Sequence, residues 1–239
     1  YVLGALMTLV GLVLGVVEMV LRILGNEITT PTIVLVALLL ISGTQFARKV
    51  NWASGIDKAS GRPIDTPMTA MVKKTEETPD FIEVWPSAFG GKNWMPMSYD
   101  PGRKLVFLNS IDLGMKVKYV KQDRPGGPNW YLGLELGGFV DPADGNRGAL
   151  VAWDPVAGKA VWTAPNKSPY WAGVLSTASG VVFTGAQNGQ FMAFDAKSGQ
   201  KLWSFQTGSG ISGLPIAWEK DGRQYITVLS GSSHVYGAL

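Results

Sequence analysis

The sequence predicts an all-β protein, a β-propeller of about four blades that forms a partial ring, preceded by a transmembrane helical segment. Three observations lead to this fold class. The N-terminus is apolar and almost uncharged, residues from 50 onward form short β-type stretches between turn residues, and a motif repeats near the C-terminus. We therefore expect a hydrophobic membrane anchor of one or two helices over residues 1–49 and a partial propeller over residues 50–239.

The first apolar stretch, Val2 to Gly25, is long enough to cross a membrane as a helix. It carries only Glu18 and Arg22 as charged residues, and at about 1.5 Å per residue it would span a hydrocarbon core of roughly 30 Å. The two charges are four residues apart and can pair on one helix face. The second apolar run, Thr32 to Ala47, is shorter, and its pattern fits either a tilted second helix or a buried β-strand.

The overall composition limits the classes of function. A chain of 239 residues with 46% hydrophobic residues can bury a core. The net charge is only +3 and the basic residues are scattered, so we expect no nucleic-acid partner. The sequence contains no cysteine, which excludes a disulfide framework and a thiolate metal site.

A repeated motif gives the β part its predicted shape. Ala152, Asp154, Gly158 and Trp162 recur 41 residues later as Ala193, Asp195, Gly199 and Trp203, and propeller blades repeat every 40 to 50 residues or so. In the second copy we expect strands at 181–184, 190–194 and 201–205, with turns at 187–189 and 195–199. The aspartate can accept backbone N–H bonds, the glycine can adopt a positive φ, and the tryptophan can cover a neighbouring blade.

Three longer motifs point to a particular family. They are NWASGIDKASGRPI (Asn51 to Ile64), GGKNWMPMSYDP (Gly90 to Pro101) and the stretch from Tyr170 to Val228 that begins YWAGVLST. Together with the tryptophan repeat they resemble the C-terminal part of the propeller of pyrroloquinoline-quinone (PQQ)-dependent alcohol dehydrogenases, nearest to the methanol dehydrogenase type. The resemblance runs from about Ile41 to the C-terminus and does not cover residues 1–40.

The resemblance implies an eight-bladed propeller that holds PQQ on its axis beside a Ca²⁺ or lanthanide ion. A carboxylate base would assist hydride and proton removal from a primary alcohol, with electrons passing to a cytochrome c or to ubiquinone. About 190 residues supply only about four blades, so the metal ligands and the catalytic aspartate are expected outside this chain. We therefore expect a membrane-bound protein with its propeller in the periplasm, inactive alone, whose partners are the remaining blades or a second chain.

Three residues are candidates for contact with the quinone by this resemblance. Asn93 matches a family position whose amide hydrogen-bonds PQQ, Trp94 follows it, and Trp171 matches an aromatic residue near the cofactor. The alternative roles are blade packing for both tryptophans and a turn amide for Asn93. The segment Ser230 to Gly237 departs from the family, because Ser232, Ser233 and His234 replace a glycine-rich loop with an aromatic residue.

Other motifs do not support a different chemistry. GSGISG (Gly208 to Gly213) fits a dinucleotide-binding pattern, but Pro215 and strand-like residues follow it, where that fold requires a helix. DPADGNRG (Asp141 to Gly148) lacks the acidic spacing of a calcium loop. The remaining alternative function is a non-catalytic, membrane-tethered propeller that acts as a binding or scaffold module.

Overall fold

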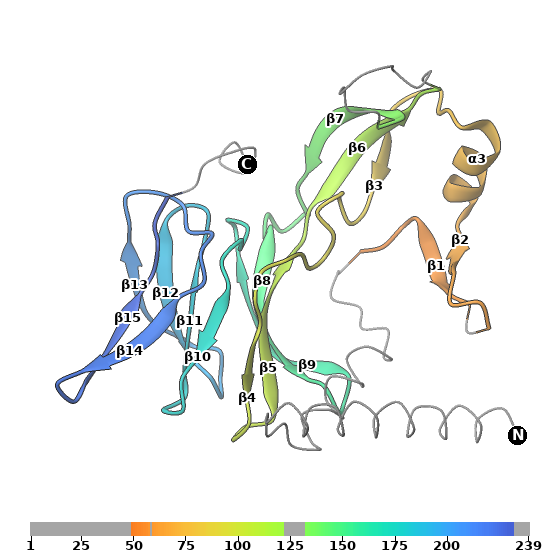
Figure 1. Cartoon of the computed structure of the whole chain (residues 1–239). Helices are drawn as coiled ribbons and strands as arrows, with labels where there is room; N and C mark the ends of the chain where they lie inside the picture. The colour runs from red at the N-terminus through yellow and green to blue at the C-terminus, as the bar shows by residue number, and fades with distance from the viewer. Residues whose placement is uncertain (1–48, 58, 122–131, 232–239) are drawn as a thin grey trace, which may run out of the picture. The chain divides into compact units, whose positions relative to one another are not determined.

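The computed structural model describes residues 49–57, 59–121 and 132–231. Its strands form five sheets, two of which have four strands (Figure 1). The first contains β4 (Ser98–Asp100), β5 (Leu105–Ile111), β8 (Gly148–Asp154) and β9 (Lys159–Asn166). The second contains β10 (Val174–Ser176), β11 (Val181–Gly185), β12 (Gln190–Asp195) and β13 (Lys201–Gln206).

The strands and turns expected in the second repeat are confirmed. β11, β12 and β13 agree with the predicted ranges to within one residue at their ends. The Asp195 carboxylate accepts the backbone N–H groups of Lys197 at 3.0 Å and Ser198 at 2.7 Å, and Gly199 has a φ of 72°. This glycine is required because few other residues adopt a positive φ without strain.

Two further sheets have only two strands each. β1 (Ala53–Ile56) pairs with β2 (Pro63–Asp65), and β14 (Ile216–Lys220) pairs with β15 (Arg223–Thr227). β15 has the same position in the sequence repeat as β11, which is the second strand of its sheet. The strands β14 and β15 therefore correspond to the first two strands of a blade. Among the described residues, two sheets have the four strands of a complete blade, and the expected number of four blades stays a prediction.

The hairpin β1–β2 corresponds to the last two strands of a blade. Its turn repeats the geometry of the Asp195 turn: the Gly61 N–H donates to Asp57 O at 2.8 Å, as the Gly199 N–H donates to Asp195 O at 2.9 Å. Gly61 has a φ of 68°. We call this element the Asp-Gly turn; it occurs at residues 57–61, 154–158 and 195–199.

The prediction that the part after residue 50 is entirely β was wrong at one helix. α3 (Pro67–Thr75) begins after Thr66, whose hydroxyl accepts the Thr69 N–H at 3.4 Å, and ends at Glu76, which has a φ of 57°. None of its residues is buried. Another addition is the sheet β3–β6–β7, of Ile82–Val84, Gly114–Tyr119 and Leu134–Val140, whose last two strands are inserted between β5 and β8.

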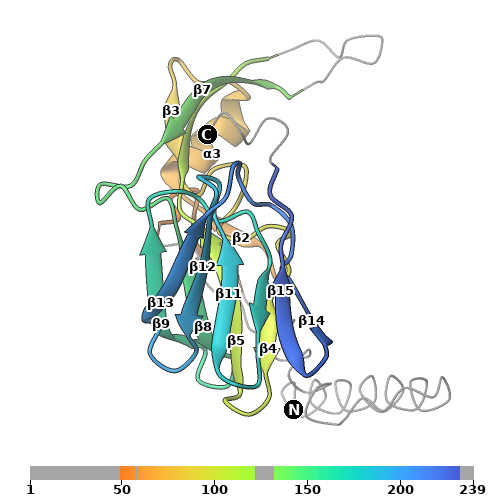
Figure 2. The same ribbon diagram turned by 90° about the vertical axis from the view of Figure 1, so that its left-hand side faces the viewer.

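The two four-stranded sheets lie side by side (Figure 2), and they pack against each other through a shared apolar core. Phe107 and Leu150 of one sheet meet Val182, Met192 and Phe194 of the other. Burial of these side chains is the main stabilising contribution, at about 1.5–3 kcal/mol for a large apolar side chain. The sheets are antiparallel and stand side by side, as blades of a propeller do.

Trp162 of β9 lies between these sheets. Its Nε1 donates to Ala196 O at 3.0 Å, and a Cβ atom on Gly199 would lie 2.7 Å from the indole. The indole therefore packs directly on the Asp-Gly turn of the next sheet. This confirms the predicted docking role of tryptophan for the first copy of the repeat.

Among residues 49–57, 59–121 and 132–231, no helix has the length and apolarity needed to cross a membrane. The predicted spans at residues 2–25 and 32–47 lie outside the described residues, so the membrane anchor stays a prediction.

Candidate functional site

The predicted tryptophans occupy equivalent places in successive sheets. Trp94 lies five residues before Tyr99, which pairs with Val106, and Trp171 lies five residues before Ser176, which pairs with Val182. Val106 and Val182 are themselves equivalent, because each pairs with the residue before the aspartate of an Asp-Gly turn. The two indoles stack with their centroids 5.4 Å apart and an interplanar angle of 29°.

Two phenylalanines extend this stack. Phe89 meets Trp171 edge to face at a centroid distance of 5.1 Å, and it stacks on Phe139 of β7 at 5.1 Å. We call Phe89, Trp94, Phe139 and Trp171 the aromatic group. Trp171 is 1% exposed and Trp94 is 57% exposed. Trp171 is therefore packed in the interior, while Trp94 offers a wide apolar surface to solvent.

Asn93 is held in the loop before β4 by its own turn. Its Nδ2 donates to Phe89 O at 3.0 Å, and its Oδ1 accepts the Trp94 N–H at 2.8 Å. These are the bonds of a turn amide. The amide nitrogen has a second hydrogen and the amide oxygen has a second lone pair. The side chain can therefore donate one further hydrogen bond and accept one from another group.

Lys92 supports the same loop, and the resemblance did not single it out. Its Nζ donates to Asn93 O at 2.9 Å and to Met95 O. Burial lowers the pKa of Lys92 to about 8, because the protein interior disfavours the ammonium form. The signal that could have identified Lys92 is its place within the GGKNW motif.

Asn109 connects the first four-stranded sheet to the segment that carries Trp171. It is fully buried, and its Nδ2 donates to Ala172 O at 2.8 Å and to Thr184 Oγ1 at 2.7 Å. The Thr184 hydroxyl in turn donates to Gly173 O at 3.1 Å. These hydrogen bonds fix the backbone on the C-terminal side of Trp171.

An open pocket of about 580 Å³ lies apart from the predicted site residues. Lys49 in it pairs with Glu83 at 3.0 Å and lies 4.7 Å over the Trp85 ring. A hydrogen bond from Trp85, followed by that from Lys49, lowers the pKa of Glu83. The lining residues are Lys49, Glu83, Trp85, Asp112, Val140, Asp141, Pro142, Ala143 and Asp144.

The motifs that we rejected are confirmed as loops. Gly208 to Gly213 is followed by strand β14 and not by a helix. In the loop after β7, Asp141 pairs with Arg147 at 2.8 Å and Asp144 accepts the Asn146 N–H at 3.0 Å. These carboxylates bind groups of their own loop, as in a solvated turn.

The residues present fit one edge of a planar quinone. The exposed indole of Trp94 can cover an aromatic ring, and the free amide hydrogen of Asn93 can bond a carbonyl at its edge. Within the described ranges, no group of three or more His, Cys, Asp or Glu residues could hold a metal ion.

Comparisons with known proteins agree with the fold and with these motifs. Residues 154–226 match the model of the glucose/ethanol/alcohol dehydrogenase β-propeller domain, PQQ. The quinoprotein alcohol dehydrogenase PedH of Pseudomonas putida is 40% identical over 193 residues, or 80% of this chain and 32% of that protein. The 1-butanol dehydrogenase (cytochrome c) of Thauera butanivorans is 36% identical over 197 residues, or 79% of this chain and 27% of that protein.

Solved structures give the same result. The quinohemoprotein alcohol dehydrogenase of Comamonas testosteroni superposes with a TM-score of 0.62 at 35% identity, covering 77% of this chain and 28% of that chain. A europium-containing methanol dehydrogenase superposes with a TM-score of 0.60 at 30% identity, covering 77% and 31%. The C-terminal part of the chain is thus similar to a segment of a PQQ-type β-propeller.

The relatives that cover this segment are quinoprotein alcohol dehydrogenases, so the resemblance predicted from the motifs is confirmed for the C-terminal part of the chain. The chain spans about a third or less of the length of these relatives. Activity, substrate and partners of a whole dehydrogenase therefore remain to be proposed for it.

Proposed function

We propose that this chain is the C-terminal portion of a membrane-associated, PQQ-dependent alcohol dehydrogenase that oxidises a primary alcohol. The single observation that carries the proposal is the stacked pair of Trp94 and Trp171 at equivalent positions of successive sheets, next to Asn93. The inner ends of propeller blades converge on the central channel, where a cofactor shared by several blades can be held.

The residues of this chain would hold the quinone at one side. Trp94 would cover its apolar surface and exclude water, Asn93 would donate its free amide hydrogen to a quinone oxygen, and Lys92 would keep the Asn93–Trp94 loop in place. When bound, PQQ supplies the two-electron acceptor for alcohol oxidation. We place the Ca²⁺ or lanthanide ion and the catalytic aspartate on polypeptide outside this chain, so the chain alone should be inactive.

The proposal extends to location and electron acceptor. The apolar sequence of residues 1–49 supports a membrane anchor, and the propeller would lie in the periplasm. Electrons would pass to a cytochrome c or to ubiquinone, and the name of the relative from Thauera butanivorans supports the first of these.

Complementation tests the proposed function. The full chain is mixed with the part of PedH that it does not match, together with PQQ and Ca²⁺ or La³⁺, and alcohol-dependent dye reduction is measured. We expect no turnover with either part alone and turnover with both. Trp94→Ala should lower this turnover, whereas Trp218→Ala, a change in the β14–β15 hairpin, should not. Turnover by this chain alone, or none in the mixture, would contradict the proposal.

A second function is favoured by a different surface. The outer strand β13 exposes Leu202, Trp203 and Phe205, which is an apolar face suited to protein contact. The alternative is a non-catalytic, membrane-tethered propeller that serves as a binding or scaffold module. This alternative would be favoured if the full chain failed to bind PQQ in the complemented mixture while a partner still shielded β13 from solvent.

A further inference from the structure

Three places in the sequence have an aspartate or asparagine directly before a glycine. They are Asp144–Gly145, Asn188–Gly189 and Asp221–Gly222. Such pairs can rearrange without an enzyme, because glycine has no side chain to shield its backbone nitrogen from the carboxyl or amide carbon of the preceding residue. The reaction requires that this nitrogen and this side chain are free to move together. Hydrogen bonds in the native fold therefore decide which pair reacts.

Two of the three pairs are held by hydrogen bonds on both of their reacting groups. In both, the glycine N–H donates to the backbone O three residues earlier, at 2.8 Å for Gly145 and 3.0 Å for Gly189. In both, the side-chain oxygen accepts the backbone N–H two residues later, at 3.0 Å for Asp144 and 3.1 Å for Asn188. These bonds must break before either pair can rearrange.

The third pair has neither bond. Asp221 and Gly222 form the two-residue turn between β14 and β15, with φ values of 51° and 72°, and a type I′ turn requires a positive φ at both positions. Within the ranges that the structure describes, the Gly222 N–H donates no hydrogen bond and the Asp221 carboxylate has no hydrogen bond or ion pair. A Cβ atom on Gly222 would meet nothing within 4 Å. Both reacting groups are therefore free to approach each other.

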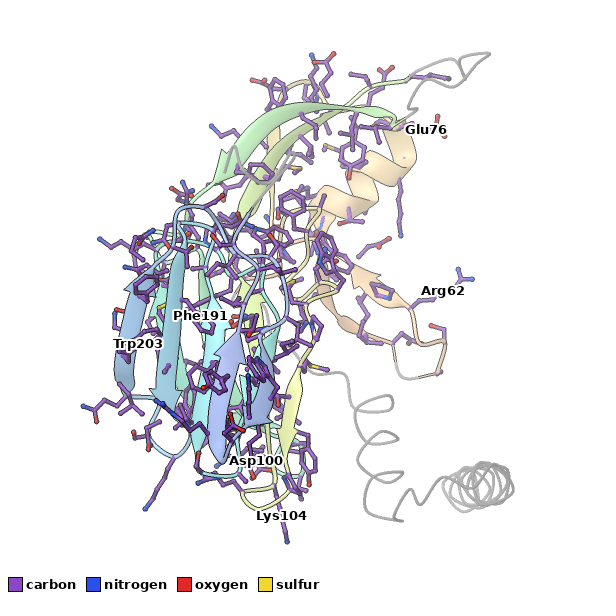
Figure 3. All side chains as sticks on the ribbon, turned by 60° about the vertical axis from the view of Figure 1, so that its left-hand side comes forward. Arg62, Glu76, Asp100, Lys104, Phe191 and Trp203 are labelled. Atoms are coloured by element: carbon purple, nitrogen blue, oxygen red, sulfur yellow. The ribbon has the colours of Figure 1, made fainter. Side chains whose placement is uncertain are left out.

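The exposure of this turn follows from its place in the blade. The corresponding turns of the two four-stranded sheets join β4 to β5 and β10 to β11, and these sheets have all four strands. Residues 101–104 in the first turn and residues 178–179 in the second are nevertheless exposed. Figure 3 shows Lys104 at the end of its turn, with its side chain pointing away from the sheets. Strands added beside β15 would therefore leave Asp221 and Gly222 accessible to solvent.

We propose that Asp221 is a site of spontaneous isoaspartate formation in the folded protein. The Gly222 nitrogen bonds to the side-chain carboxyl carbon of Asp221, and the carboxyl OH leaves with the amide hydrogen as water, which closes a five-membered succinimide ring. Water then adds to the backbone carbonyl carbon of Asp221. The bond from this carbon to the Gly222 nitrogen breaks, and the nitrogen recovers a hydrogen. The atoms balance and nothing is oxidised or reduced. This inference does not depend on quinone binding.

The product changes the turn because the chain now runs through the side chain of Asp221 and gains one backbone carbon. A two-residue type I′ turn matches the twist of its two strands, and Lys220 pairs with Arg223 directly beside it. Trp218 stacks on Tyr225 at a centroid distance of 4.5 Å two pairs further along. We therefore expect the pairing of β14 with β15 to loosen from the turn inward, which amide hydrogen exchange detects.

Ageing of the full chain tests the proposed site. One sample is kept folded for weeks in neutral buffer with mild detergent, and a second is kept in urea. A protease that cleaves after glutamate releases peptides, in which electron-transfer fragmentation locates isoaspartate. In the folded sample we expect Asp221 to react about tenfold or more faster than Asp144 or Asn188, because two hydrogen bonds hold each of the other pairs. In urea Asp144 should react as fast as Asp221.

Asp221→Gly is the matched control variant, because glycine adopts the same positive φ and has no carboxyl group. Its peptide should contain no isoaspartate, and amide exchange in its β15 should not change on ageing, whereas exchange in β15 of the aged native chain should become faster. A folded native chain without isoaspartate at Asp221 would overturn the proposal. Equal rates at the three pairs in the folded chain, or an unchanged preference for Asp221 in urea, would also do so, because the fold would then not select the site.

Discussion

Replacing Asn109 with aspartate should destabilise the propeller more than its small change in shape suggests. The native amide donates to Ala172 O and Thr184 Oγ1 from a fully buried position. A carboxylate of the same shape cannot donate, so its oxygen would face the Ala172 carbonyl oxygen. Leaving a buried charge without compensation costs about 3–5 kcal/mol, which we expect for the loss in free energy of unfolding at pH 7.

The pH dependence gives a second check on this reasoning. Burial raises the pKa of the introduced carboxyl in the folded state above its value of about 3.9 in the unfolded chain. The unfolded state therefore loses its proton first as pH rises, and folding becomes progressively less favourable. The difference in stability between Asn109→Asp and the native chain should be largest near pH 7 and should shrink as pH falls toward 4.

Urea-induced unfolding followed by tryptophan fluorescence measures both effects. The control is Asn166→Asp, because the Nδ2 of Asn166 donates only to the nearby Ser168 O, at 2.9 Å in a half-buried site. We expect the control to lose about 1 kcal/mol or less. Equal losses in the two variants, or an Asn109→Asp penalty that does not change with pH, would refute the view that Asn109 fixes the segment after Trp171.

Two further predictions concern the loop before β4 and the pairing of β5 with β8. Lys92 has a pKa of about 8 in the folded chain and of about 10.4 in the unfolded chain. Between these values the unfolded state binds more protons, so the stability of the native chain should rise from pH 8 to 10. Lys92→Met should abolish this rise, as measured by urea titrations at each pH. Gly148→Ala should cost about 1–3 kcal/mol, since its Cβ would lie 2.5 Å from Ser110 O; Gly208→Ala, with open space, should cost under about 0.5 kcal/mol in the same thermal unfolding assay.

Local patterns predicted one blade closely and the rest of the fold less well. The strands between Val181 and Gln206 followed from alternation and turn chemistry, because each turn lies within a few residues of the strands it joins. The Asp57 turn was missed as a repeat because Asp65 stands where the later copies have tryptophan. The first complete blade was obscured by the insertion of β6 and β7 between its second and third strands.

The parts that the sequence could not predict depend on long-range contacts. Helix α3 has only nine residues and buries none of them, and so short an apolar pattern does not distinguish a helix from a strand. Asn109 bonds residues 63 and 75 positions away, and nothing in its local sequence indicates those partners. The candidate residues Asn93, Trp94 and Trp171 came from family resemblance. Their contact with a quinone remains a prediction, although the structure brings the two tryptophans together.

The repeat also explains where the aromatic surface of this chain ends. The position five residues before Glu219, which pairs with Gln224, is Leu214. In the β14–β15 sheet this leucine takes the place that Trp94 and Trp171 have in the two preceding sheets, and a Cβ on Gly173 would lie 2.5 Å from it. A leucine cannot continue the indole stack, because it has no aromatic face. The stack of indoles therefore ends at Leu214 on the C-terminal side.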